Sequence, residues 1–243
     1  MPTRTIVVSD LHGFGALLES ALADAGFGPG DGLVVAGDLV DIGPDDCVAL
    51  AERYGATILA GNHEVSAALG VDIAPQNVET PARGPDFAKR FLTGEWPLAA
   101  AVDGWLVTHG GLSTAFHDAI ERVDGDVERL AAELNEAFRS ELRRFFHHEI
   151  TQWDIGRSPI LGSEFGPLWF RAARPVTVPD GLKQVVGHTP CELFPPESIA
   201  ALERKPFLLV DPGAHLAPEP AGRFRYAVIE NGEAHVVHGC TAE

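Results

Sequence analysis

Short apolar runs recur along the chain, and each one ends in polar or glycine-containing sequence. The runs are rich in Val, Ile and Leu, which is typical of buried strands. They cover residues 6–8, 33–36, 57–60, 105–107 and 184–186. We therefore expect a sheet whose strands carry polar residues at one end.

Helical spacing separates the first three runs. Residues 15–25 repeat Leu and Ala on one face, and residues 45–54 do the same with Asp45 as a candidate N-cap. Alternation of strand and helix predicts an α/β fold with a parallel sheet covered by helices.

The C-terminal part has a different pattern. Residues 207–210, 224–230 and 234–237 look like strands joined by short turns, and Asn231-Gly232 is a strong hairpin signal. This pattern predicts an antiparallel portion of the architecture.

Two segments interrupt the strand pattern. Residues 65–98 are mixed and contain several prolines, whereas residues 117–150 place Leu130, Leu134, Phe138 and Leu142 on the stripe of one long helix. We interpret residues 1–243 as one domain with insertions at about 65–98 and 117–170, because no repeat or clear linker is visible.

The charge balance is strongly acidic. Lys and Arg number 18 and Asp and Glu number 35, so the net charge is −17. Such a surface repels nucleic acid and anionic lipid, so neither is an expected partner. No stretch approaches the ~20 apolar residues of a membrane span. Three scattered cysteines suggest no disulfide framework, and we see no signal peptide, so a cytoplasmic location is expected.

The polar residues behind the five apolar runs suit divalent metal ions. In an open α/β sheet these strand ends meet at one rim. Carboxylate and imidazole together favour Mn, Fe or Zn. Asp10 and His12 would hold one ion, while Asn62, His109 and His188 would hold a second. A carboxylate has two oxygens, so Asp38 is the natural bridge between the ions. A pair of ions can activate water and neutralise charge during displacement at phosphorus.

The motifs DLHG, GDLVDIGP, GNHE, HGG and GHTP resemble those of the calcineurin-like metallophosphoesterase superfamily. More narrowly, they are similar to the phosphoprotein phosphatase group, whose pattern is GDxHG, GDxxDRG, GNHE, HG and GH. The resemblance runs from residue 9 to about residue 190. It implies a sandwich of mixed β-sheets flanked by helices, with a helical insertion.

Carried over by position, the resemblance assigns a role to each residue. Asp10, His12 and Asp38 would bind one metal, and Asp38, Asn62, His109 and His188 the other, with Mn the expected metal and Fe or Zn the alternatives. A hydroxide bridging the metals would attack phosphorus directly. His63 would be the general acid, with Asp41 orienting its imidazole. Arg171 would clamp the phosphate oxygens together with Asn62.

Two residues depart from the group pattern. Ile42 stands where the family has an arginine, so one phosphate clamp is missing, and Ser9 replaces a glycine. Arg83, Arg157 or Arg174 could replace the clamp from an insertion. Asp211, before Pro212-Gly213, could lie near the site, but we interpret it as a turn residue.

The leading hypothesis is a phosphomonoesterase, specifically a protein Ser/Thr phosphatase. Its substrate would be a phosphorylated protein or a small phosphate ester. The alternative is a symmetrical diadenosine tetraphosphate hydrolase, in which Phe87, Trp96 or Trp169 would form the base pocket. A non-catalytic pseudophosphatase is supported by Ile42 alone. The sequence does not indicate an oligomeric state.

Overall fold

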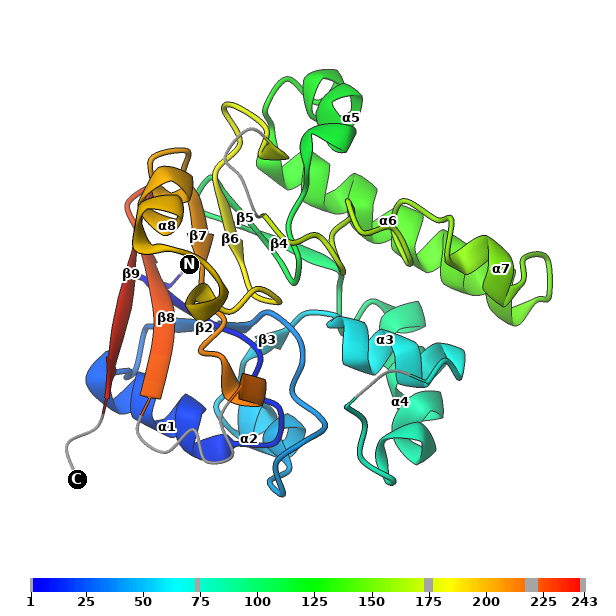
Figure 1. Ribbon diagram of the computed structural model, residues 1–243, viewed down its shortest axis with the longest axis horizontal. Coiled ribbons are helices and arrows are strands. Elements are labelled where there is room, and N and C mark those ends of the chain that lie inside the picture. The colour runs from blue at the N-terminus through cyan, green and yellow to red at the C-terminus, as the bar shows by residue number, and fades with distance from the viewer. Residues whose placement is uncertain (1, 73–74, 173–176, 217–222, 241–243) are drawn as a thin grey trace.

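Two β-sheets pack face to face at the centre of the molecule (Figure 1). The computed structural model describes residues 2–72, 75–172, 177–216 and 223–240. The first sheet has the order β3-β2-β1-β8-β9 and the second has the order β4-β5-β6-β7. The strands are β1 (Thr5–Val8), β2 (Gly32–Val35), β3 (Thr57–Ile58), β4 (Ala99–Val102), β5 (Trp105–Thr108), β6 (Gln184–Val186), β7 (Phe207–Leu209), β8 (Arg223–Glu230) and β9 (Glu233–Cys240).

Both sheets are mixed, as predicted. Strands β1, β2 and β3 run parallel, and β8 joins β1 in antiparallel register with Ile6 opposite Val228. In the second sheet β5, β6 and β7 are parallel and β4 is antiparallel to β5. The parallel strands of each sheet therefore end at a common edge, where the polar motifs begin.

The inner faces of the two sheets form an apolar core. Its members alternate along the strands with residues on the outer faces, as the two-residue period of a strand requires. They are Val7, Val34, Ala36, Leu59, Trp105, Val107, Val185, Leu208, Val210, Ala227 and Ile229. The sheets are thus held together mainly by aliphatic contacts.

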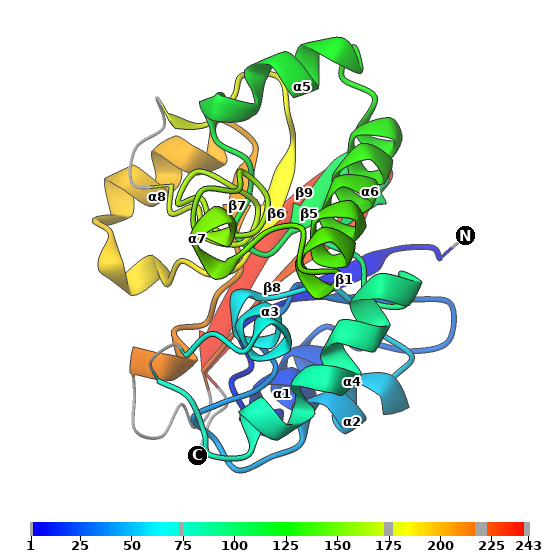
Figure 2. The ribbon, with the colours of Figure 1, turned by 90° about the vertical axis from the view of Figure 1, so that its right-hand side faces the viewer.

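Helices cover the outer faces. The helices are α1 (Gly15–Asp24), α2 (Cys47–Arg53), α3 (Asn62–Leu69), α4 (Thr80–Thr93), α5 (His117–Arg122), α6 (Val127–Phe146), α7 (Gln152–Ile155) and α8 (Pro196–Glu203). Helix α1 packs on β1 and β8, α6 on β4 and β5, and α8 on β7. Figure 2 shows α3, α4 and α6 together on one flank of the sheets.

The flank of α3, α4 and α6 is joined by aromatic side chains. Phe91 of α4 meets Phe138 of α6 edge to face at 5.4 Å between ring centroids. Phe87 and Trp96 stack at 5.6 Å, and all four rings are almost completely buried. These contacts tie the flank into the main core.

The segment predicted as one long helix is two helices. Asp124 and Gly125 separate α5 from α6 with φ of 53° and 73°, a left-handed conformation that ends a helix. Asp126 then caps α6, because its carboxylate accepts a hydrogen bond from the N–H of Arg129 at 2.8 Å. Helical periodicity continues across this break, which is why the pattern suggested one element.

Other outcomes concern smaller elements. The hairpin at Asn231-Gly232 is confirmed, with both residues at positive φ as a two-residue turn between β8 and β9 requires. Strand β4 and helix α3 were not predicted. Within the described residues, no helix is long and apolar enough to cross a membrane.

Candidate metal centre

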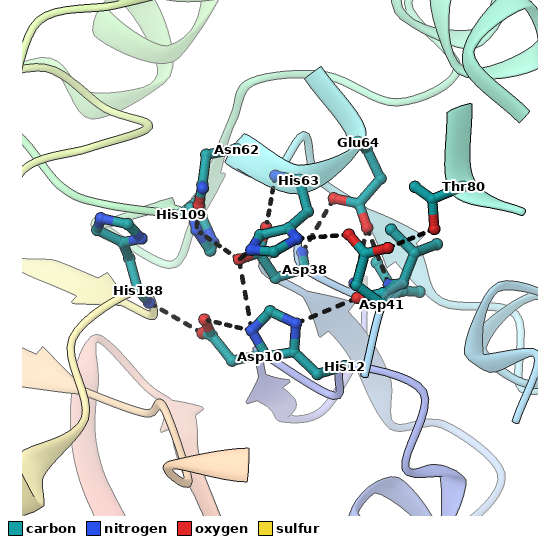
Figure 3. A network of polar contacts seen from close by, with 12 residues as sticks. Asp10, His12, Asp38, Asp41, Asn62, His63, Glu64, Thr80, His109 and His188 are labelled. Atoms are coloured by element: carbon teal, nitrogen blue, oxygen red, sulfur yellow. Dashed lines mark hydrogen bonds and ion pairs between the residues drawn. The ribbon is translucent and has the colours of Figure 1, made fainter. Parts of the chain in front are cut away.

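Polar residues from both sheets converge where the parallel strands end (Figure 3). From the first sheet, Asp10 follows β1, Asp38 follows β2 and Asn62 opens α3 just after β3. From the second, His109 follows β5 and His188 follows β6. Together with His12, these are the six residues predicted to bind metal, and all are at least 96% buried.

Asp38 is the common member of two groups that could hold an ion. His12, Asp38 and His63 form one group, and Asp38, His109 and His188 form the other, each with candidate ligand atoms within 4.8 Å of one another. Oδ2 of Asp38 lies 3.6 Å from Nε2 of His12 and 3.4 Å from Nε2 of His109. Its other oxygen accepts a hydrogen bond from the N–H of His63 at 3.1 Å.

Asp10 and Asn62 complete the ring of donors. Oδ1 of Asp10 lies 3.9 Å from Nε2 of His12, and Oδ2 accepts a hydrogen bond from the N–H of His188 at 2.9 Å. Oδ1 of Asn62 is 2.7 Å from Nε2 of His109. The structure therefore brings all six predicted ligands to one place, and His63 lies with His12 and Asp38 in the first group.

Backbone carbonyls orient two of the imidazoles. Nδ1 of His12 lies 3.1 Å from the carbonyl of Val40, and Nδ1 of His109 lies 2.8 Å from that of Ala36. A carbonyl only accepts, so Nδ1 donates in both rings, and Nε2, which faces Asp38, is the atom that could bind a metal. This is the arrangement of histidines that bind metal through Nε2.

The side chains of His63 and Asp41 are in contact, as the predicted pair requires. Nδ1 of His63 donates to Oδ2 of Asp41 at 2.5 Å. The other Asp41 oxygen accepts from the N–H of Asn77 at 2.8 Å and from the hydroxyl of Thr80. Asn77 and Thr80 were missed by sequence reasoning because they lie 36 and 39 residues from Asp41.

Glu64 is a second support that the sequence did not reveal. Its buried carboxylate accepts hydrogen bonds from the N–H groups of Asp38, Leu39 and Val40, at 3.0, 2.8 and 3.2 Å. It thereby clamps the loop after β2 to the first turn of α3. Gly61 permits this approach, since a Cβ there would lie 2.3 Å from the N atom of Asp38. Glu64 is the last residue of the GNHE motif, but the motif alone does not indicate that its side chain supports the loop after β2.

The backbone of the site is strained. Asp10, His12, Asp38, Asp41, Ile42 and His188 all have positive φ, between 45° and 74°. For the β-branched Ile42 this conformation is a true outlier. Such residues persist only where their surroundings hold them, and they cluster at functional sites.

Charge within the site favours a bound cation. Burial disfavours the ionised form of Asp38, but the imidazoles of His109 and His63 outweigh it and hold its pKa well below the usual range. Burial would lower the pKa of His63 and His109, yet Asp38 raises them to about 9 and about 10. Without an ion, protonated imidazoles thus supply the positive charge that the buried carboxylates require.

Asp211 lies in this neighbourhood. It is fully buried after β7, and one of its oxygens accepts a hydrogen bond from the N–H of Gly213 at 2.7 Å. Burial and then the nearby carboxylate of Asp10 raise its pKa well above the usual range. The bond to Gly213 agrees with the turn interpretation, and the nearby Asp10 supports the alternative that Asp211 lies near the site.

The predicted substrate residues have mixed positions. Arg171 is exposed in a pocket that also includes His188 and Trp169. Phe87 and Trp96 are core residues, so the prediction that they could line a base pocket is wrong, and Trp169 is the member of that trio beside the site. Arg83 pairs with Asp46 at 3.3 Å, Arg157 is exposed, and Arg174 lies outside the described residues.

Comparison with known proteins supports a family assignment. A model of the calcineurin-like phosphoesterase family matches residues 3–214. A serine/threonine-protein phosphatase 1 of Salmonella typhimurium is 38% identical over 92 residues, which are 37% of this chain and 42% of that relative. The match therefore spans about two fifths of the relative's length.

Solved structures share the fold. A cold-active protein-tyrosine phosphatase of Shewanella sp. has a TM-score of 0.64 and 17% identity, covering 97% of this chain and 80% of the other. A serine/threonine phosphatase of Saccharomyces cerevisiae gives 0.56 and 14%, covering 99% and 81%. A candidate diadenosine tetraphosphatase gives 0.53 and 18%, covering 100% and 97%. The chain belongs to the calcineurin-like phosphoesterase family, whose members hydrolyse phosphoric esters.

Proposed function

We propose that the protein is a dinuclear metal-dependent phosphomonoesterase that acts on phosphorylated proteins. The observation that carries the proposal is the pair of donor groups that share Asp38. Family membership supports the reaction class, and the match to the Salmonella phosphatase supports a protein substrate.

The residues present fit two divalent ions. Asp10, His12 and Asp38 would hold one, and Asp38, Asn62, His109 and His188 the other. The donor set supports this, because imidazoles, carboxylates and an amide oxygen suit Mn, Fe or Zn better than Mg or Ca. The orientation of the His12 and His109 rings is the second support. Mn is the metal we expect.

When bound, two such ions supply a nucleophile at neutral pH and positive charge for the oxygens around phosphorus. The protein's own groups then act on the substrate. Arg171 binds phosphate oxygens with its planar fork, and the amide of Asn62 is close enough to the centre to contact the phosphate.

His63 donates a proton to the leaving oxygen. Nε2 of this ring lies 3.9 Å from Oδ2 of Asp38, so it faces the centre, while Nδ1 is held by Asp41. Asp41 is a positioning residue that fixes the tautomer and favours the protonated ring. The hydrogen bond from His63 to Asp41 raises the pKa of the imidazole, which favours the protonated form that a proton donor requires.

The finer substrate assignment rests on one motif and one relative. The GNHE motif with Glu64 and the Salmonella relative favour phosphoserine and phosphothreonine. A cytoplasmic location is consistent with such substrates. Nothing in the donor set favours the pseudophosphatase, because every predicted ligand and His63 reach the centre.

The test is metal analysis combined with a panel of phosphate monoesters and added Mn. The Asp38→Asn variant should lose most bound metal and at least about 10²-fold in kcat, because the shared carboxylate oxygen is removed. Asp72→Asn, at an exposed position, is the matched control and should behave as the unmodified protein. Full metal content and activity in Asp38→Asn would contradict the proposal.

A further inference from the structure

A pocket of about 690 Å³ opens beside the candidate metal centre, on the side of His188. Its walls include the rings of Phe165 and Trp169, and Arg171 also lines it. The Trp169 ring meets the His188 ring edge to face, with centroids 5.9 Å apart. The pocket is therefore continuous with the site that would hold the phosphate.

The Trp169 wall is held rigidly against the centre. Its indole N–H donates to the carbonyl of Leu161 at 3.0 Å. Pro167, two residues before Trp169, is also anchored, because its carbonyl accepts a hydrogen bond from the N–H of Gly110 at 2.5 Å. A Cβ on Gly110 would lie 2.9–3.0 Å from the backbone of residues 168–170, so only glycine permits this contact.

The Phe165 wall is attached to the same loop. The hydroxyl of Ser113 donates to the carbonyl of Phe165 at 2.9 Å. Ser113 lies four residues after His109, in the segment that follows β5. Both aromatic walls are thus positioned by the loop that carries a predicted ligand, although the Phe165 ring itself is 50% exposed and free to receive a partner.

The charges of the pocket restrict what can occupy it. Among its described lining residues, Arg171 is basic and Glu164 is acidic. Phe165 and Trp169 line the same pocket as Arg171, so the ester group of a phosphate held by Arg171 can reach the two rings. Further phosphates there would face Glu164 and the field of a chain with a net charge of −17.

We propose that this pocket is a leaving-group subsite for an aromatic ring, so that the enzyme hydrolyses phosphotyrosine in addition to phosphoserine and phosphothreonine. This inference rests on the proposed function. A tyrosyl ring can stack or meet edge-on with Phe165 and Trp169, whereas the single methylene of serine leaves the pocket empty. Hydrolysis breaks the bond between phosphorus and the phenolic oxygen. Water supplies the new phosphate oxygen, and the released tyrosine takes a proton from His63.

The test uses the Mn-loaded enzyme and two peptides of identical sequence that carry phosphotyrosine or phosphoserine. Aryl esters are intrinsically more reactive, so the readout is the change in the ratio of kcat/KM between variants. Phe165→Ala and Trp169→Leu should each lower the ratio of phosphotyrosine to phosphoserine by about three- to tenfold, mainly through KM. Phe165→Ala is the milder variant, because this ring is half exposed.

The matched control is Trp153→Ala, which removes an indole that is 76% exposed on α7 and does not line the pocket. It should leave both peptides unaffected. An unchanged ratio in both pocket variants would refute the subsite while the phosphomonoesterase stands. The inference would be overturned if the enzyme hydrolysed diadenosine tetraphosphate faster than both phosphopeptides and the same variants slowed that reaction. The pocket would then bind a nucleobase in place of the tyrosyl ring. Failure of the unmodified enzyme on every monoester would reject the proposed function itself.

Discussion

Single residues outside the predicted ligand set hold the candidate centre in shape. Glu64 binds three consecutive N–H groups of the loop that carries Asp38, and Thr80 and Asn77 hold the carboxylate of Asp41. Each contact offsets part of the strain at residues with positive φ. The positions of Asp41 and of Asp38 therefore depend on side chains outside the predicted ligand set.

At this scale we predict a selective loss in His63→Asn. The variant should keep its metal but lose about 10²–10⁴-fold in kcat on alkyl esters, whose leaving oxygen requires a proton. Aryl esters should lose much less, because a phenolate leaves more readily. A series of monoesters with graded leaving-group pKa measures the effect.

The control is His117→Asn, since His117 is exposed on α5 and pairs with Glu121 at 3.2 Å. It should not change the dependence on the leaving group. An equal loss across the ester series in His63→Asn would argue against a proton donor.

The convergence of the predicted ligands could be inferred from the sequence, but the side chains that support them could not. Asp10, Asp38 and His188 stand directly behind apolar runs, so a strand-end argument places them at one edge. Thr80 and Asn77 instead reach Asp41 through the path of the chain between α3 and α4, which local pattern does not specify. The same is true of the pocket, because the approach of residues 167–170 to Gly110 is a tertiary contact.

At the scale of elements, the helices and strands that the sequence did not predict are those with a weak local sequence pattern. Strand β4 consists largely of alanine, which has low strand propensity, and it exists through its antiparallel pairing with β5. Helix α3 begins at Asn62, inside the GNHE motif. The motif was interpreted as candidate metal and acid residues, and the start of a helix there was not predicted. The break before α6 could be predicted only if Asp124 and Gly125 were expected to adopt the left-handed conformation that ends a helix.

The flank of α4 and α6 should depend on one aromatic contact. Phe138→Ala should lower the free energy of unfolding by about 3–5 kcal/mol, because it empties a fully buried site against Phe91. Chemical denaturation measures the change. Phe145→Ala, on the half-buried side of the same helix, should cost about 1 kcal/mol. Equal losses would show that the Phe91–Phe138 contact is not central to the flank.

At the scale of the whole molecule, the acidic surface acts against the anionic substrate. The net charge of −17 repels a phosphorylated group during approach, while the positive charge of the centre acts only at short range. Substrates with basic residues around the phosphate would compensate for this field. We therefore expect the protein to select by the charge of the surrounding peptide as well as by the proposed subsite.

Ionic strength should reveal this effect. Raising the salt from about 0.01 M to 0.15 M shortens the Debye length from about 30 Å to 8 Å. The kcat/KM of an acidic phosphopeptide should therefore rise, and that of a basic phosphopeptide should fall. Stopped assays at low substrate concentration measure both slopes. Parallel slopes for the two peptides would show that surface charge does not govern encounter.

The predicted ligands come from both layers of the sandwich: Asp10, Asp38 and Asn62 follow strands of one sheet, and His109 and His188 follow strands of the other. Cations bound among them would cross-link two layers that are otherwise joined mainly by aliphatic packing. Metal binding would then stabilise the interface between the two sheets, so that catalysis and the stability of the sandwich would depend on the same ligand atoms. An empty centre would cost the protein rigidity as well as chemistry.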